Sequence, residues 1–127
     1  MIAFADLAGQ SALIGQLQSD FARGRYVHAY LLTGPGGTGK RSAAQLCAMA
    51  ALCRGEKKPC GACGPCRRVL SGTHPDVHTV VPEKGKQIIG VGVMREVLDT
   101  VSVKSFEDGA KVILIPEAER MNAAAQN

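Results

Sequence analysis

The sequence predicts an α/β fold in which helices cover both faces of a parallel sheet. Apolar segments of strand length alternate with segments of helical character, which is the order that produces such a sheet. Residues 111–115 form the strongest apolar segment and have no polar residue in their last four positions, as in the middle of a parallel sheet. A glycine-rich loop between the first predicted strand and a helix is the third indication. With 127 residues, the chain is expected to form one domain at most.

The first half of the chain contains four predicted elements. Residues 10–23 have apolar side chains at helical spacing, which indicates an amphipathic helix. Residues 29–33 are a short apolar run that is typical of a buried strand. Residues 42–53 are rich in Ala, Leu, Met and Cys and contain no Pro or Gly, so they are expected to be helical. Residues 67–71 are expected to form a short helix.

The second half of the chain is expected to continue the alternation. It contains a strand at 76–81, a polar turn at 83–86, a helix at 91–103, a loop at 104–109 and a strand at 111–115. Helical spacing at 91–103 predicts a buried face formed by Met94, Val97, Leu98 and Val101.

Residues 34–40 match the phosphate-binding pattern G-x-x-x-x-G-K. The glycines let successive backbone N–H groups turn toward one anion, and the start of the following helix adds partial positive charge. Lys40 is expected to reach the terminal phosphates of a bound nucleotide. With ATP as the candidate ligand, the predicted nucleotide-binding residues are Gly34, Pro35, Gly36, Gly37, Thr38, Gly39, Lys40 and Arg41.

Two positions depart from a metal-dependent nucleotide site. The residue after Lys40 should carry a hydroxyl that ligates Mg²⁺, but it is Arg41, whose guanidinium has no acceptor. The residue that ends the strand at 111–115 should be an aspartate that helps to hold the same ion, but it is Pro116. Glu117 is the remaining candidate for a catalytic carboxylate. The chain is therefore not expected to be an active ATPase by itself.

A structural zinc site is predicted from four cysteines in the spacing C-x6-C-x2-C-x2-C, namely Cys53, Cys60, Cys63 and Cys66. Each C-x2-C step places two sulfurs on one tight turn, and four thiolates leave no open position on the ion. The spacing leaves other arrangements open: an iron–sulfur cluster, a disulfide, redox chemistry at one C-x2-C pair, or replacement of one ligand by His74. The fifth cysteine, Cys47, is expected to be a small core residue of its helix.

The composition limits the classes of function. An excess of basic over acidic residues gives a formal charge of +4, which permits contact with nucleic acid. The absence of tryptophan and the few other aromatic residues leave no visible base-stacking platform. The chain has neither a long apolar run nor the start of a signal peptide, so we expect a cytoplasmic protein without membrane association.

Several segments resemble one protein family. Residues 4–10 and 28–32 are similar to the clamp-loader AAA+ subunits of bacterial DNA polymerase III, as is a four-cysteine module placed directly after the first helix of the nucleotide site. The segments His74-Pro75-Asp76-Val77 and Ala118-Glu119-Arg120-Met121-Asn122 resemble the delta-prime type more than the gamma/tau type.

The resemblance implies a function in DNA replication, as part of a complex with gamma/tau and delta subunits that loads the sliding clamp onto primed DNA. It implies that residues 1–127 are the N-terminal part of an AAA+ nucleotide-binding domain and that residues 53–66 are an inserted zinc module. The sensor segment, arginine finger, lid and collar of the family would then lie beyond Asn127.

Two classes of function follow from the resemblance. Delta-prime subunits often carry a degenerate nucleotide site, which Arg41 and Pro116 match, and they act as structural members of the complex. The alternative is an active ATPase motor of the gamma/tau type. A third hypothesis is a zinc-dependent DNA-binding module in which Arg67 and Arg68 contact phosphate.

Overall fold

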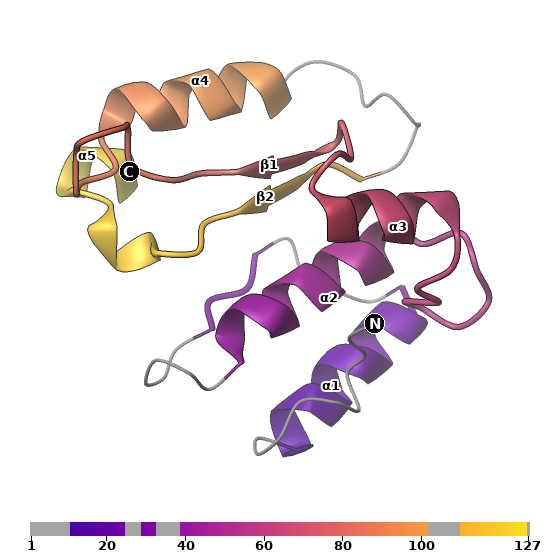
Figure 1. Cartoon of the computed structure of the whole chain (residues 1–127). Helices are drawn as coiled ribbons and strands as arrows, with labels where there is room; N and C mark the ends of the chain where they lie inside the picture. Colours follow the sequence, from indigo (N-terminus) through magenta and orange to yellow (C-terminus); the bar gives the residue numbers. More distant parts are fainter. Residues whose placement is uncertain (1–10, 25–28, 33–38, 102–109, 127) are drawn as a thin grey trace. The chain divides into compact units, whose positions relative to one another are not determined.

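The computed structural model describes residues 11–24, 29–32, 39–101 and 110–126. The chain divides into two compact units, Met1–His74 and Pro75–Asn127. Three helices make up the described part of the first unit, and two strands with their surrounding helices make up that of the second (Figure 1). Among the described residues, each helix falls short of the length and apolar character that a membrane span requires.

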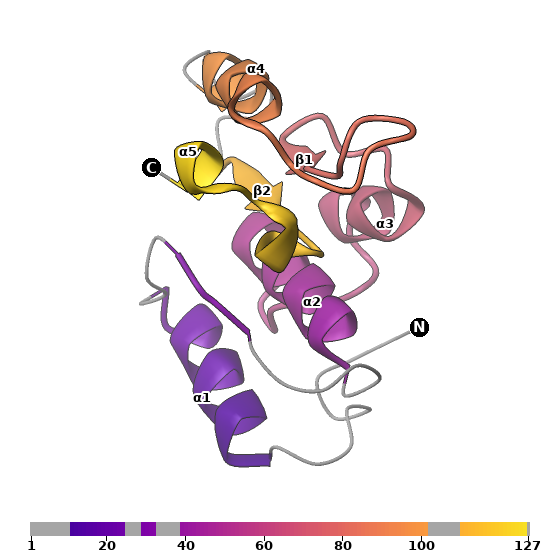
Figure 2. The ribbon, with the colours of Figure 1, turned by 90° about the vertical axis from the view of Figure 1, so that its left-hand side faces the viewer.

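Two helices of the first unit, α1 (Ser11–Ala22) and α2 (Lys40–Leu52), pack side by side (Figure 2). Leu17 and Phe21 lie one turn apart on α1 and are buried. The alanine-rich composition of α2 favours a helix and allows close packing. Its buried residues are Ala43, Leu46, Ala48, Met49, Ala50 and Leu52. The two helices predicted at 10–23 and 42–53 are confirmed, with small differences at their ends.

The third helix, α3 (Gly64–Ser71), begins earlier than the predicted helix at 67–71. Pro65 is suited to its first turn, where a backbone N–H has no partner within the helix. Gly72 ends the helix in a left-handed conformation with φ 76°, which glycine adopts without strain. Because α3 packs against α2, the segment that joins them folds back into a short loop. This loop and the first turn of α3 carry the four clustered cysteines.

The strand predicted at 29–33 is not formed by residues 29–32, and Thr33 lies outside the described residues. Leu31 has 76% of its surface exposed, whereas a buried strand was expected. Tyr30 contacts Phe21 instead, with ring centroids 5.9 Å apart. A strand needs a hydrogen-bonded neighbour, and both described strands belong to the second unit.

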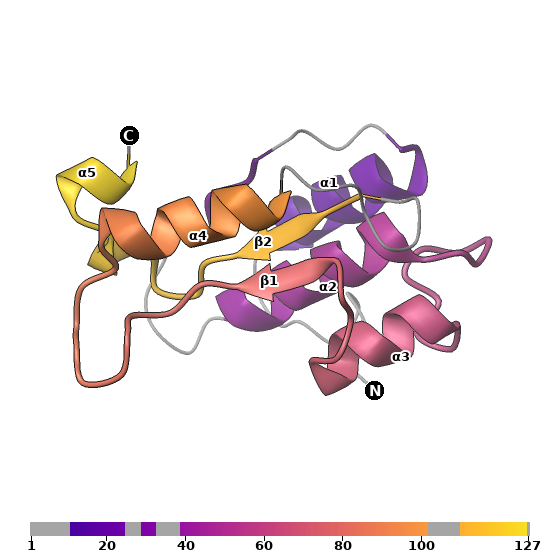
Figure 3. The same ribbon diagram turned by 90° about the horizontal axis from the view of Figure 1, so that it is seen from above.

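The second unit is built on two parallel strands, β1 (Val77–Thr79) and β2 (Val112–Leu114), with Val77 opposite Val112 (Figure 3). Backbone hydrogen bonds extend the pairing at both ends, since Val112 N–H donates to the Asp76 carbonyl and Val80 N–H to the Leu114 carbonyl, each at 2.8 Å. Parallel strands need a crossover, and this one contains α4 (Val91–Val101), which lies along one side of the pair. The predicted parallel sheet is confirmed as a small one, and helices on both of its faces stay a prediction.

The predicted apolar face of α4 is only partly buried. Met94 and Val97 are half-buried, but Leu98 is 57% exposed, so its predicted burial is wrong. Two short strands offer too narrow a surface to cover a wide helix face. The side chain of Val101 and the loop predicted at 104–109 lie outside the described residues.

The C-terminal segment is anchored on Ile89, which is fully buried and forms a parallel bridge with Met121. Ile89 N–H donates at 2.8 Å to the carbonyl of Arg120, the last residue of the short 3-10 helix η2 (Ala118–Arg120). Asn122 then caps the short helix α5 (Ala123–Gln126), because its Oδ1 accepts a hydrogen bond from Ala125 N–H at 2.9 Å. The predicted polar turn at 83–86 is also present, closed by a hydrogen bond from Lys86 N–H to the Glu83 carbonyl.

Candidate metal centre

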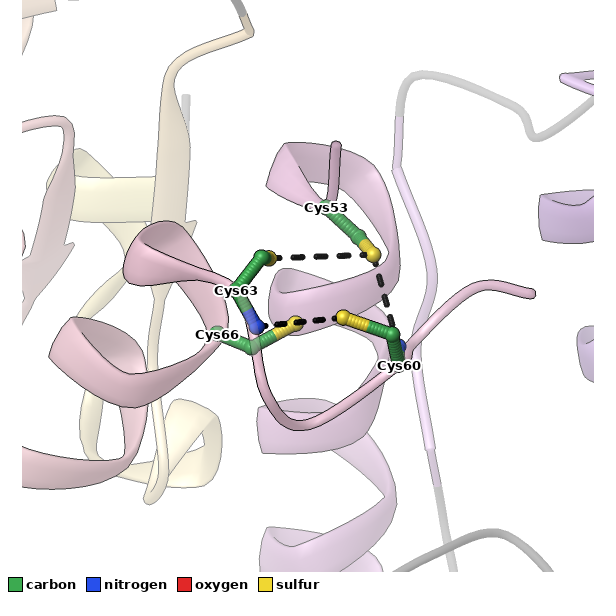
Figure 4. A group of neighbouring side chains, drawn as sticks. All are labelled: Cys53, Cys60, Cys63 and Cys66. Carbon is green, nitrogen blue, oxygen red and sulfur yellow. Dashed lines mark hydrogen bonds between the residues drawn. The ribbon is translucent and has the colours of Figure 1, made fainter. Parts of the chain in front are cut away.

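Three local features of the first unit bring four cysteines together (Figure 4). Cys53 directly follows the last residue of α2, and Cys63 directly precedes α3. Cys66 lies in the first turn of α3 and is fully buried, while Cys60 belongs to the connecting loop. The packing of α3 on α2 therefore supplies three of the sulfurs, and the loop supplies the fourth.

The four sulfurs fit a single tetrahedral metal ion. All of them lie within 4.8 Å of one another, and the Cys53 and Cys63 sulfurs are 3.9 Å apart. A zinc ion with Zn–S bonds of about 2.3 Å requires sulfurs about 3.8 Å apart. All five cysteines are free thiols, and His74 is not a member of the group. These four residues can hold a metal ion, and the disulfide and His74 arrangements are not formed.

Backbone N–H groups point at two of the sulfurs. Cys53 Sγ accepts hydrogen bonds from the N–H groups of Gly55 and Cys60, at 3.2 and 3.3 Å. Cys60 Sγ accepts them from the N–H groups of Ala62 and Cys63, at 3.4 and 3.2 Å. Such bonds stabilise the thiolate form, which is the form that binds metal, and they orient the sulfur.

The ionisation of the thiols reflects these surroundings. Hydrogen bonds from the Ala62 and Cys63 backbone lower the pKa of Cys60 to about 6. Burial raises the pKa of Cys63, but hydrogen bonds with the Arg54 and Cys66 backbone outweigh it, so the pKa of Cys63 is lowered overall. Burial dominates at Cys66 and raises the pKa of its thiol. A bound cation would convert all four thiols to thiolates and release their protons.

Gly55 is a residue of the site that the sequence analysis missed. A Cβ atom at this position would lie 2.9 Å from Cys60 Cβ and 3.1 Å from Cys60 Sγ, which is closer than real Cβ contacts allow. The only signal in the sequence was a glycine two positions after the first cysteine. Gly61, between Cys60 and Cys63, adopts a left-handed conformation with φ 74°, which glycine adopts without strain.

The fifth cysteine, Cys47, is half-buried in α2 and lies outside the group of four. Burial raises the pKa of Cys47 to about 11. At pH 8 in the presence of a chelator, Cys60 is therefore expected to be a thiolate and Cys47 a thiol. We predict that iodoacetamide modifies Cys60 several-fold faster than Cys47, measured by mass spectrometry of peptides over time. Equal rates for the two cysteines would contradict this assignment.

The predicted nucleotide site is described only in part, since Gly34, Pro35, Gly36, Gly37 and Thr38 lie outside the described residues. Gly39 adopts a left-handed conformation with φ 86° and directly precedes α2. Lys40 is the first residue of α2, and Arg41 follows with its side chain exposed. Glycine at position 39 therefore allows a sharp turn of the chain directly before α2.

The other two residues considered for that site lie in the second unit, after β2. Pro116 is half-buried and Glu117 is exposed. Glu117 forms an ion pair with Arg120, with Oε1 and Nε 3.2 Å apart. Its carboxylate is therefore engaged locally, in an interaction typical of a protein surface.

Comparison with known proteins identifies the family. A family model described as "DNA polymerase III, delta subunit" matches residues 9–127. The delta' subunit of DNA polymerase III from Yersinia pestis is 38% identical over 114 residues, which cover 88% of this chain and 34% of the relative. The delta' subunit from Pseudomonas aeruginosa is 38% identical over 120 residues, which cover 93% of this chain and 36% of the relative.

A different subunit type matches with lower identity. The tau subunit of DNA polymerase III from Bacillus subtilis is 32% identical over 126 residues, which cover 98% of this chain and 22% of the relative. The chain spans about a third of the length of the delta' relatives. The matches confirm the resemblance seen in the sequence, and the chain belongs to the DNA polymerase III delta subunit family.

Proposed function

We propose that the protein acts in DNA replication as a delta-prime-type subunit of the DNA polymerase III clamp loader. The observation that carries this proposal is the family match over residues 9–127, together with 38% identity to delta' relatives. In this role the protein helps to load the sliding clamp onto primed DNA. Its partners are the gamma/tau and delta subunits, and its compartment is the cytoplasm.

The four-cysteine group fits a structural zinc site within this function. The group offers four sulfur atoms, and their spacing suits one zinc ion. Because four ligands complete the tetrahedral coordination of zinc, no coordination position is left for a substrate. An iron–sulfur cluster places several atoms between its ligands and needs a wider cage than sulfurs that all lie within 4.8 Å. In this proposal residues 53–66 are a zinc module inserted into an AAA+ nucleotide-binding domain to which residues 1–127 belong.

The nucleotide site is proposed to have lost its magnesium ion. Arg41 follows the loop lysine and offers no ligand, Pro116 stands where an aspartate is expected, and Glu117 is paired with Arg120. The alternative is an ATPase motor of the gamma/tau type. It is favoured by the complete glycine–lysine pattern at 34–40 and by the match to a tau subunit.

Reconstitution tests the function. The complete gene product that carries this sequence is combined with gamma/tau and delta subunits, the sliding clamp, primed DNA and ATP, and clamp loading is measured. The proposal expects loading to require the protein and to persist when the protein carries Lys40→Ala. Loading that proceeds equally well without the protein would refute the function. Loading abolished by Lys40→Ala would favour the motor alternative instead.

The nucleotide site yields a separate prediction. We expect negligible ATP hydrolysis by the complete protein alone, and nucleotide binding that does not depend on Mg²⁺. Because Arg41 lies in the first turn of α2, its charge is expected to replace that of the metal beside the phosphates. Arg41→Ala should then weaken binding roughly tenfold or more, the effect of losing a charge-assisted hydrogen bond.

Titration of labelled ATP with and without Mg²⁺ measures these affinities. Arg41→Thr serves as the matched variant, because it restores the hydroxyl that the pattern lacks. Tighter binding of this variant only in the presence of Mg²⁺ would show that the site merely lost its hydroxyl. If neither variant changes the affinity, Arg41 does not contact the nucleotide.

A further inference from the structure

The four-cysteine module, residues 53–68, accounts for the excess of basic over acidic residues in the chain. Residues 53–68 contain five basic residues and one acidic residue, Glu56. With the cysteines as neutral thiols, their net charge of +4 equals that of the whole chain, so basic and acidic residues balance in the remainder. Four thiolates around one Zn²⁺ would leave the module with a net charge of +2. The five basic residues are Arg54, Lys57, Lys58, Arg67 and Arg68. Such a concentration of charge is the electrostatic footprint of a polyanion-binding surface.

The fold holds these cations close to the cysteine cluster. Arg54 directly follows Cys53, Arg67 directly follows Cys66, and the sulfurs of these two cysteines lie within 4.8 Å of each other. Lys57 and Lys58 lie in the loop between them, which Cys60 ties to the same cluster. The side chains of Arg54, Lys57, Lys58 and Arg67 are exposed. Arg68 is half-buried and is left out of the surface defined below.

Several residues between the basic positions of the module are small. They include Gly55, Gly61 and Ala62 in the connecting loop. Gly61 needs its left-handed conformation, and Gly55 has no room for a Cβ atom. The long basic side chains of the module are therefore separated by small residues rather than by other large side chains.

We propose that Arg54, Lys57, Lys58 and Arg67 form a surface that binds the phosphate backbone of duplex DNA. The module has no aromatic residue between positions 53 and 72, so it lacks the stacking platforms by which proteins hold single-stranded bases. Contacts made by lysine and arginine alone read charge rather than sequence. The charge distribution indicates a polyanion, and the choice of duplex DNA rests on the proposed function. A clamp loader works beside the duplex part of primed DNA.

The test measures binding of the full, zinc-loaded chain to a short fluorescein-labelled duplex by anisotropy, over a range of salt concentrations. Four phosphate contacts predict a slope of log K against log salt of roughly −3 to −4, so affinity should fall about 100-fold between about 50 and 200 mM salt. The paired change Lys57→Ala and Lys58→Ala should reduce the slope by about 2. It should also leave the zinc content unchanged.

The matched control is Lys84→Ala with Lys86→Ala, which removes the same charge from an exposed turn of the second unit. This control should keep the wild-type slope. The proposed surface would be wrong if the chain did not bind the duplex. It would also be wrong if the two lysine pairs changed the slope of log K against log salt equally. The proposal would also be wrong if the Lys57/Lys58 variant lost zinc but kept its affinity for DNA. The two lysines would then stabilise the cysteine thiolates and would not contact DNA.

Clamp loading separates this inference from the proposed function. If the full chain does not bind duplex DNA but reconstituted loading still requires the protein, the surface is wrong and the function stands. If loading does not require the protein but the chain binds DNA with the predicted slope, the function is wrong and the surface stands.

Discussion

Replacing Cys66 by serine is expected to abolish stoichiometric metal binding and to destabilise the helical unit by several kcal/mol, on the order of the loss of a structural metal. Cys66 is the cluster cysteine with no exposed surface, and it lies where α3 packs against α2. Its replacement removes one of the four sulfurs and leaves a buried hydroxyl near the Met49 carbonyl, next to three thiols that would no longer share a cation. Wild-type protein should contain about one zinc per chain.

Elemental analysis and thermal unfolding with and without EDTA measure this effect. EDTA should lower the unfolding temperature of the wild type and leave that of Cys66→Ser unchanged. Cys47→Ser is the matched control, because Cys47 belongs to α2 but not to the cluster, and it should keep both the zinc and its sensitivity to EDTA. A Cys66→Ser protein with one zinc and wild-type stability would show that the cluster is not the metal site.

The damage is expected to stay within the first unit. The strands β1 and β2 and the Ile89–Met121 bridge belong to the second unit, which has its own backbone hydrogen bonds. Hydrogen exchange should therefore show lost protection in α3 and retained protection at the amides of Val80 and Val112 in Cys66→Ser. Equal loss of protection in both units would mean that they unfold as one.

Replacing Gly55 by alanine is expected to weaken zinc binding by about 10- to 100-fold, as loss of outer-shell support does at other metal sites. The added methyl group would meet Cys60 Cβ at 2.9 Å and Cys60 Sγ at 3.1 Å. The Cys60 side chain cannot move freely, because its sulfur accepts two backbone hydrogen bonds and, in the proposed zinc site, binds the ion. Relief of the contact requires a shift of Cys60 away from the other sulfurs.

Competition with a chelator of known zinc affinity measures this loss. Gly15→Ala is the control, since it lies in α1 with nothing within 4 Å of the added Cβ. Alanine is favoured over glycine in a helix by about 1 kcal/mol, so this control should raise the unfolding temperature slightly and leave zinc affinity unchanged. Zinc affinity of Gly55→Ala equal to that of the wild type would mean that the loop tolerates the methyl group.

The features predicted correctly from the sequence are those with local causes. The helices at 11–22 and 40–52 follow from apolar spacing and from a stretch rich in alanine and free of glycine and proline. The proximity of Cys60 and Cys63 follows from the tight turn that a C-x2-C step makes. Strands were predicted at 76–81 and 111–115 within a parallel sheet, and residues 77–79 and 112–114 do form parallel strands. That these two strands are direct neighbours was not predicted.

Other features depend on what lies beside a segment in space, which no local pattern reveals. Leu31 and Leu98 have the hydrophobicity of core residues but are largely exposed, because burial requires a covering neighbour and not only an apolar side chain. The ion pair between Glu117 and Arg120 appears only once the chain turns through η2. A catalytic candidate from the sequence thereby becomes a locally paired surface carboxylate.

The sequence by itself indicated the family, the two longer helices of the first unit and the four cysteines of the candidate metal site, because these follow from motif spacing and side-chain chemistry along the chain. Only the tertiary structure decided that α3 folds onto α2 closely enough to bring Cys53 and Cys66 to one point, 13 positions apart in sequence. It also decided that the glycine at position 55 lies against Cys60 with no room for a methyl group. The physical reason is that a close contact is a property of two packed segments, whereas a motif is a property of one.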